Sequence, residues 1–206
     1  MAVLVEGGLA ILALVVAWFF RIPLREQFPP AGKPLVLAFF RGVLATLPML
    51  IVFLWLVHSS SPTLQQLRRQ VEWLMGELFP TQSIAQFALI AVLAGVGEEL
   101  LFRGALQTLV GRWTTPVAGL LIVSLLFGLA HALSKLYFGL ATLIGAYFGW
   151  LALQYNDLVA PMVAHSLYDF AALVYLSRMG RQPGDSDIVR SDGEAEPVLD
   201  NEKEAK

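Results

Sequence analysis

The sequence predicts an all-α protein: a polytopic bundle of about six transmembrane helices, with one amphipathic interfacial helix and a disordered C-terminal tail. Of its 206 residues, 57% are hydrophobic and only 15% are charged, and the mean hydropathy is +0.66. Because a membrane span needs about 20 residues, this length allows about six or seven spans. The chain has no cysteine, which excludes disulfides, thiolate zinc sites and a cysteine nucleophile.

Two apolar runs and a loop make up the first 57 residues. Residues 3–20 contain Glu6 where a signal peptide would be positively charged, and no small-residue cleavage site follows, so we expect a retained first span. The connector from Arg21 to Pro34 contains four prolines and one glycine, which is typical of a turn-rich surface loop. A second span covers about Leu35–Val57.

An amphipathic segment follows the second span. Its apolar residues fall mostly three or four positions apart, with charged residues between them: Leu64, Leu67, Val71, Leu74, Met75 and Leu78. This period predicts a helix, and the mixed polarity is typical of a helix lying in the membrane interface. A loop helix packed on the bundle would give the same pattern.

Four more apolar runs complete the predicted membrane domain. They cover about residues 83–110, 116–133, 136–153 and 158–177. Only Ser134 and Lys135 separate the second and third of these runs, which predicts a tight antiparallel hairpin. We therefore expect an integral membrane domain over residues 1–179. The remaining residues, 180–206, have eight acidic and four basic side chains and few apolar ones, so we expect an acidic, disordered tail.

The run over residues 83–110 carries three charged residues, Glu98, Glu99 and Arg103. A charged side chain near the middle of a bilayer costs roughly 2.5 to 3.5 kcal/mol, so these groups should face protein or water. Glu99 and Arg103 have the four-residue spacing of an ion pair on one helical face, whereas Glu98 is rotated by about 100° and lacks that partner. We therefore assign Glu99 and Arg103 supporting roles and expect Glu98 to be the reactive carboxylate.

Two other spans also carry polar groups of catalytic type. One contains His131, and the other contains His165 with Asp169 four positions later, on the same helical face and able to contact the imidazole. Phe127 precedes His131 by four positions and can wall a site. Ionisable groups inside apolar spans mark functional sites by default. If these three spans converge, a carboxylate and two imidazoles surround one water molecule.

This set of residues supports two kinds of hydrolysis. In the first, Glu98 acts as a general base with His131 toward a water that attacks a peptide carbonyl, while the His165 face stabilises the oxyanion, and no cofactor is required. In the second, Glu98, His131 and His165 bind a zinc ion that keeps water in its open position. The residues alone leave both chemistries open.

In order and spacing, these residues resemble the motifs of the CPBP family, which includes CaaX prenyl proteases of the Ras-converting endopeptidase type and bacteriocin-processing or immunity proteins. The motifs are Glu98-Glu99 with Arg103, Phe127 with His131, and His165 with Asp169. The resemblance covers about residues 83–177. It implies an intramembrane endopeptidase whose water-filled cavity opens toward the cytosol. By this resemblance, Glu98 and His131 would activate the water, and His165 with the residue at Asp169 would hold the oxyanion.

One position departs from the family's pattern. The well-understood proteases of the family carry Asn where this chain has Asp169. An amide can donate a hydrogen bond to an oxyanion, whereas an ionised carboxylate repels it. Asp169 is therefore expected to be protonated, to orient His165, or to serve a metal as ligand or second-sphere partner.

We expect a multi-pass protein of a bacterial plasma membrane that hydrolyses a peptide bond of a membrane-associated polypeptide. Its partners would be that substrate and the lipid bilayer, and no basic patch indicates nucleic acid. The lysines and arginines near the spans divide five against five between the two faces, so orientation and oligomeric state stay open. Two alternatives come from other classes. One is a non-catalytic binding or immunity protein with the same polar cavity, and the other is an ion transporter, for which we see no internal repeat.

Overall fold

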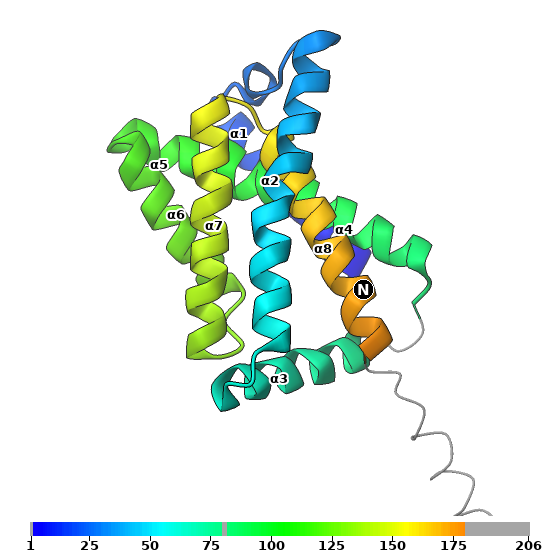
Figure 1. Cartoon of the computed structure of the whole chain (residues 1–206). Coiled ribbons are helices and arrows are strands. Elements are labelled where there is room, and N and C mark those ends of the chain that lie inside the picture. The colour runs from blue at the N-terminus through cyan, green and yellow to red at the C-terminus, as the bar shows by residue number, and fades with distance from the viewer. Residues whose placement is uncertain (1, 80–81, 180–206) are drawn as a thin grey trace, which may run out of the picture.

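The structure is a computed structural model that describes residues 2–79 and 82–179. Every regular element in these ranges is helical, which confirms the predicted all-α fold (Figure 1). The elements are α1 (Ala2–Phe19), η1 (Leu24–Gln27), α2 (Lys33–His58), α3 (Pro62–Leu78), α4 (Ile84–Glu99), η2 (Leu100–Gln107), α5 (Thr108–Trp113), α6 (Pro116–Ala130), α7 (Lys135–Tyr155) and α8 (Val159–Met179). The predicted tail lies outside the described residues, and the predicted domain boundary stays a prediction.

Six apolar helices stand where the sequence predicts the spans. Among the described residues, four are long and apolar enough to cross a membrane: Lys33–His58, Ile84–Trp113, Lys135–Tyr155 and Val159–Met179. The other two, Val3–Phe19 and Pro116–Ala130, are apolar but shorter. The predicted span over residues 116–133 was too long, because His131 leaves helical geometry with φ −107° and ψ 13°. The protein is an integral membrane helix bundle.

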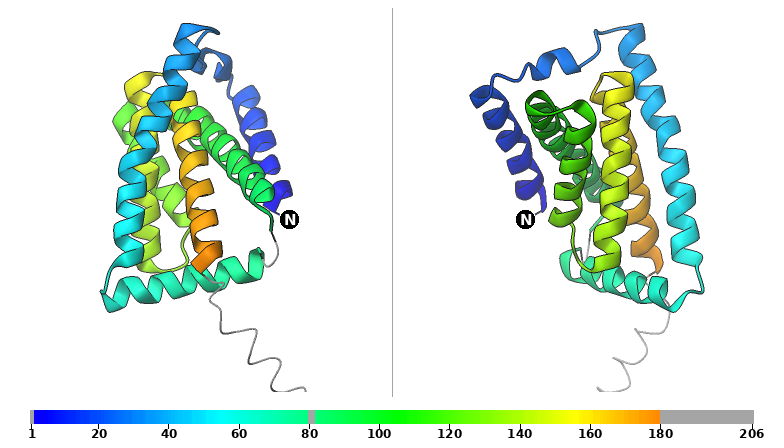
Figure 2. Two further views of the ribbon diagram at one scale, coloured as in Figure 1. Left: turned by 45° about the vertical axis from the view of Figure 1, so that its right-hand side comes forward. Right: turned by 90° about the vertical axis from the view of Figure 1, so that its left-hand side faces the viewer.

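The helices pack around α8. Helix α8 contacts α2, α4, α7 and α3, while α6 packs on α7, and α1 packs on α4 and η2. Figures 1 and 2 show α2, α7 and α8 running side by side and α3 crossing one end of them. The segment predicted to be amphipathic is thus a helix that lies across the spans, as a helix in the membrane plane would. Its position in the interface stays a prediction.

The connector between α1 and α2 is mostly exposed, as expected for a surface loop, but part of it packs inward. Ile22 is buried, and the short 3-10 helix η1 brings Gln27 against the bundle, where Gln27 O accepts a hydrogen bond of 2.9 Å from Leu158 N at the start of α8. A proline-rich composition predicts a turn but does not say which side of the turn packs inward. The connector therefore closes one end of the bundle.

The span with the three charged residues is not a uniform α-helix. Residues 100–107 form the π-helix η2 between α4 and α5. π-Helical turns are rare and often occur at functional sites. Two carbonyls of this turn accept hydrogen bonds from side chains: Gly104 O from Gln27 Nε2 at 3.1 Å and Arg103 O from Thr108 Oγ1 at 3.3 Å. Because η2 begins directly after Glu99, its geometry sets the direction in which Arg103 points.

Two glycines allow α4 to approach its neighbours closely. A Cβ atom on Gly97 would lie 2.5 Å from Glu6 O on α1, and one on Gly95 would lie 2.8 Å from Ser166 N on α8. Any larger residue would push these helices apart. Since both glycines come just before Glu98, the two close crossings bring α1 and α8 to the carboxylates of α4.

Candidate active site

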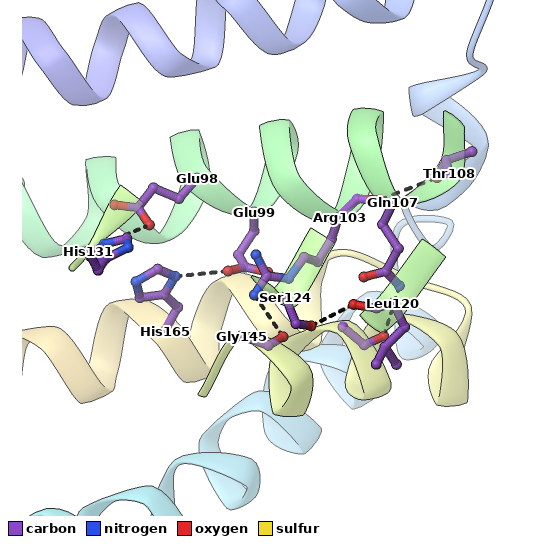
Figure 3. A network of polar contacts seen from close by, with 11 residues as sticks. Glu98, Glu99, Arg103, Gln107, Thr108, Leu120, Ser124, His131, Gly145 and His165 are labelled. Atoms are coloured by element: carbon purple, nitrogen blue, oxygen red, sulfur yellow. Dashed lines mark hydrogen bonds and ion pairs between the residues drawn. The ribbon is translucent and has the colours of Figure 1, made fainter. Parts of the chain in front are cut away.

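A row of polar side chains runs along α4 and η2 through the bundle (Figure 3). From one end to the other it contains His131, Glu98, His165, Glu99, Arg103, Gln107 and Thr108. These residues come from α4 to α5, from the turn after α6, and from α8. The three spans that were predicted to converge therefore do so.

The pair of Glu98 and His131 forms the more open end of the row. Glu98 Oε2 lies 3.6 Å from His131 Nε2, and the two side chains are 9% and 31% exposed, respectively. This distance is too long for a hydrogen bond, and Glu98 Oε2 has no hydrogen-bond partner among the described residues. His131 Nδ1 lies 2.8 Å from Phe127 O. Because a carbonyl only accepts, Nδ1 carries the hydrogen, and the second nitrogen faces Glu98.

Glu99 lies at the centre of a closed cluster, and its side chain is 0% exposed. Glu99 Oε2 lies 3.4 Å from Arg103 Nε, and Glu99 Oε1 lies 2.9 Å from His165 Nδ1. Arg103 Nη2 in turn donates to Gly145 O of α7 at 2.8 Å. The pairing of Glu99 with Arg103 is confirmed. The contact of Glu99 with His165, 66 residues later, was not predicted.

His165 is held between two carboxylates. Its Nδ1 faces Glu99, and its Nε2 lies 3.3 Å from Asp169 Oδ2, which confirms the contact predicted from their spacing. Two carboxylates around one ring are the partners that a doubly protonated imidazole prefers, because ionised carboxylates only accept hydrogen bonds. The side chain of Asp169 is 29% exposed, and it contacts Nε2, the ring nitrogen that does not face Glu99. This contact fits the orienting role among the three that were expected for Asp169.

Aromatic rings cover both imidazoles. Phe127 stacks on His131 with ring centroids 4.4 Å apart, and Arg103 lies over the same phenyl ring at 4.6 Å. Phe148 of α7 stacks on His165 with centroids 4.7 Å apart. A cation over an aromatic face is stabilised by the ring's quadrupole. Phe127 was predicted as a wall of the site, whereas Phe148 was missed because nothing on its charge-free span distinguished it.

The polar row ends at a hollow on the other end of the bundle. Gln107 Nε2 donates to Gly149 O of α7 at 3.1 Å. Beyond it lies a cavity of about 420 Å³, between η1, α5 and the ends of α7 and α8, whose lining includes Arg103, Gln107 and Arg112. Gln107 was not predicted, although it lies one helical turn after Arg103. Polar groups thus extend from the turn after α6 to the opposite end of the bundle.

The predicted zinc site does not fit this arrangement. Among residues 2–79 and 82–179, no three His, Asp or Glu side chains are grouped as metal ligands. His165, one of the three predicted ligands, has both ring nitrogens on carboxylates. It would have to lose one of these contacts to bind a metal.

One carboxylate close to the site was not among the predicted residues. Glu6 lies on α1, and its main-chain oxygen packs against Gly97, the residue before Glu98. The sequence carried a signal for it, because Glu6 is an ionisable residue in an apolar run, which is the criterion that singled out Glu98. The sequence analysis interpreted Glu6 only as evidence that the first apolar run is not a signal peptide.

Comparison with known proteins finds a family match over the part of the chain that contains the site. Residues 80–171, which include Glu98, His131 and His165, match the family described as type II CAAX prenyl endopeptidase Rce1-like. The chain is also 32% identical over 117 residues to the uncharacterized protein YpbD of Bacillus subtilis (strain 168), a match that covers 54% of this chain and 58% of that protein. No solved structure matches the chain. The predicted resemblance is confirmed as a resemblance: residues 80–171 match the Rce1-like family of type II CAAX prenyl endopeptidases.

Proposed function

We propose that the protein is an intramembrane endopeptidase that cleaves a peptide bond of a membrane-associated polypeptide with water activated by Glu98 and His131. The observation that carries the proposal is the different use of two adjacent carboxylates. Glu99 contacts Arg103 and His165, whereas Glu98 Oε2 is buried, has no hydrogen-bond partner among residues 2–79 and 82–179, and faces His131 Nε2. The family match supports a peptidase at the level of the reaction class.

The first step is removal of a proton from water. The 3.6 Å between Glu98 Oε2 and His131 Nε2 leaves both atoms able to bind a third partner. A water placed against both atoms gives its proton to this pair as its oxygen forms a bond to the peptide carbonyl carbon. General-base catalysis of this kind contributes about 10²- to 10⁴-fold to a rate. The Phe127 carbonyl keeps the imidazole of His131 in the tautomer that this step requires.

The second requirement is stabilisation of the oxyanion. The His165 imidazolium lies beside the base pair and is fixed by Glu99 and by the stacked ring of Phe148. A fixed positive charge next to developing negative charge stabilises a transition state because it needs no reorganisation during the reaction. Asp169 must turn away from His165 Nε2 for that nitrogen to donate to the oxyanion, and its partial exposure leaves it room to do so.

The substrate in this proposal is a polypeptide that reaches the site from the bilayer. The helices around the site expose apolar side chains to the surroundings, including Leu89 and Val92 on α4, so an apolar or lipid-anchored segment can approach beside them. We propose a bacterial plasma membrane as the location and an opening toward the cytosol. No cofactor takes part in the proposed steps.

A cleavage assay with purified protein tests the proposal. Membrane peptides with apolar C-terminal segments are offered to wild type, Glu98→Gln and His131→Ala in detergent or liposomes. We expect both variants to lose at least about 100-fold in kcat while they stay folded, because each loses one half of the base. Glu77→Gln is the matched control, since Glu77 is exposed on α3, away from the site. A chelator is expected to leave the wild-type rate unchanged.

Other outcomes would contradict the proposal. Equal cleavage by wild type and both site variants would show that the measured activity does not come from this site. Binding of a peptide without any cleavage across the set of substrates would favour the non-catalytic binding or immunity protein. Loss of activity in a chelator that zinc restores would contradict the metal-free steps.

A further inference from the structure

The cavity of about 420 Å³ lies at the end of the bundle away from α3, where several helix ends meet. Figure 1 shows the connector that contains η1 and the C-terminal end of α7 at this end. Trp113, at the end of α5, is 67% exposed, and Phe20 packs against it with ring centroids 5.7 Å apart. Exposed tryptophans at the ends of membrane spans mark the interface between lipid and water. The cavity therefore lies at the level of the lipid headgroups.

The lining of this cavity carries charges of both signs. Glu26 and Asp157 are its acids, and Arg112 is a base at the same cavity. Main-chain hydrogen bonds hold two of them: Asp157 Oδ1 accepts from Ala160 N at 2.8 Å, and Arg112 Nη1 donates to Arg21 O at 3.2 Å. Among residues 2–79 and 82–179, none of the three is in an ion pair. Their charges are therefore available to a ligand.

The lining also holds buried polar groups that a ligand can satisfy. Asp157 is only 5% exposed, and a buried carboxylate is costly unless a positive partner compensates it. Gln107 is 4% exposed, and its Oε1 has no hydrogen-bond partner in the described part of the chain. A ligand with N–H donors would supply partners for both oxygens. The cavity is thus built for a polar occupant.

The two signs of charge select the chemical class of that occupant. A simple anion would meet Glu26 and Asp157, and a simple cation would meet Arg112. A molecule that carries both an ammonium and a phosphate avoids both conflicts. Its ammonium can donate to the carboxylates, and its phosphate can accept from the guanidinium, which binds phosphate in a fork geometry. The lining therefore matches a phosphate ester of a primary amine.

The surface beside the cavity indicates that the ligand is a lipid. Leu153 of α7 lines the cavity and is 42% exposed, and Trp150, one turn closer to the bilayer centre, is 47% exposed. On the neighbouring helix α6, Val117 and Leu121 are 63% and 55% exposed. Apolar side chains thus continue from the rim of the cavity along the two helices. Acyl chains attached to a headgroup in the cavity would lie against them.

We propose that this cavity binds the headgroup of an aminophospholipid such as phosphatidylethanolamine. The ammonium lies against Asp157 and Glu26, the phosphate lies against Arg112, and the acyl chains run along α6 and α7. The lipid joins the connector between α1 and α2 to the ends of α5, α7 and α8. This site does not depend on the proposed peptidase function.

A comparison of three lipids tests the site. The purified full chain in detergent micelles is titrated with phosphatidylethanolamine, phosphatidylcholine or phosphatidylglycerol of equal chain length, and bound lipid is counted by native mass spectrometry. Phosphatidylcholine keeps the positive charge but has no N–H donor, and phosphatidylglycerol has no amine. We expect phosphatidylethanolamine to bind about tenfold more tightly than either, because only it makes charge-assisted hydrogen bonds at both ends. Soluble glycerophosphoethanolamine at the same concentration should not displace it.

Two variants should change these affinities in different ways. Asp157→Asn keeps an oxygen that caps Ala160 N but loses the charge, so it should weaken phosphatidylethanolamine by about tenfold and leave phosphatidylglycerol unchanged. Arg112→Gln should weaken all three lipids, because all three carry the phosphate. The matched controls are Glu77→Gln and Arg69→Gln, since both residues are exposed on α3, and both should bind as wild type does.

Several results would overturn the proposal. Equal binding of the three lipids by wild type would show adventitious lipid only. Equal weakening of phosphatidylethanolamine and phosphatidylglycerol in Asp157→Asn, or unchanged binding in Arg112→Gln, would contradict the assigned contacts. Displacement by the soluble headgroup would show that the ligand is not a lipid. If Asp157→Asn does not fold, Glu26→Gln replaces it, because Glu26 is exposed on η1, and the same difference between the two lipids is expected.

Discussion

Glu98 and Glu99 are neighbours in the chain, yet they lie in two different environments. Glu98 belongs to an open pair with His131, in which the closest atoms are 3.6 Å apart and the imidazole is partly exposed. Glu99 belongs to a closed cluster with Arg103 and His165, in which every member is buried. The turn of about 100° between consecutive helical residues separates the two. We infer that the open pair carries the chemistry and that the closed cluster holds the helices in place.

The largest effect is expected when the closed cluster loses one partner. Arg103→Met leaves the carboxylate of Glu99 without its guanidinium inside the bundle, and it removes the hydrogen bond to Gly145 O. Breaking a buried ion pair from one side costs about 3 to 5 kcal/mol. We expect a loss of this size in the free energy of unfolding, measured by denaturation in mixed micelles.

The matched control for this change is Arg69→Met, because Arg69 is exposed on α3. Its effect should stay within about 0.5 kcal/mol. His131→Ala, on the open side, should change stability much less than Arg103→Met. If His131→Ala destabilised the protein as strongly, the division between the open pair and the closed cluster would be wrong.

An intermediate effect is expected at the glycine that supports the open pair. A methyl group on Gly97 would collide with Glu6 O, whereas a methyl group on Gly76 of α3 meets nothing within 4 Å. Gly97→Ala should therefore cost about 1 to 3 kcal/mol of folding free energy, as overpacking does. It should also slow cleavage, because α1 moves away from Glu98. Gly76→Ala should instead stabilise α3 by about 0.5 to 1 kcal/mol. If Gly97→Ala left the free energy of folding unchanged, α1 would not be held against α4 at this point.

The smallest effect is expected at Asp169, whose carboxylate contacts His165 of the closed cluster. In Asp169→Asn the amide oxygen can still accept from His165 Nε2, and the amide nitrogen adds a donor for the oxyanion. A neutral acceptor is weaker than a charged one by about 1 kcal/mol, so kcat should change by less than about tenfold. Asp169→Leu, which removes the acceptor, should be slower than Asp169→Asn in the same assay. A loss in Asp169→Asn as large as in Asp169→Leu would show that the charge itself is needed.

Contacts within one helix were the predictable part of the site. The pair of Glu99 with Arg103 and the pair of His165 with Asp169 are each four residues apart, and both contacts are present. The spacing is enough because any regular helix brings such residues together. Glu99 and Arg103 stay in contact across the π-helical turn that follows Glu99. No periodicity in the sequence predicted that turn.

Contacts between helices were predictable only in outline. The sequence indicated that Glu98, His131 and His165 would meet, because polar groups in apolar spans avoid lipid. It did not indicate that His165 would pair with Glu99 rather than with Glu98, nor that Phe148 would stack on His165. These details depend on the rotation and depth of α8 and α7 relative to α4, which no local pattern encodes.

The sequence by itself determined that this chain is a helical membrane protein and that its charged residues inside spans had to find one another. Composition and periodicity decide these properties, because every backbone polar group within the lipid core must be satisfied inside the protein, which a helix does with its own residues. Helical spacing already predicted that Glu98 lacks the arginine partner, but only the tertiary structure decided that His165 pairs with Glu99 and that Glu98 faces His131. The reason is steric: Gly95 and Gly97 set how closely α8 and α1 cross α4, and these crossings assign each side chain its neighbours.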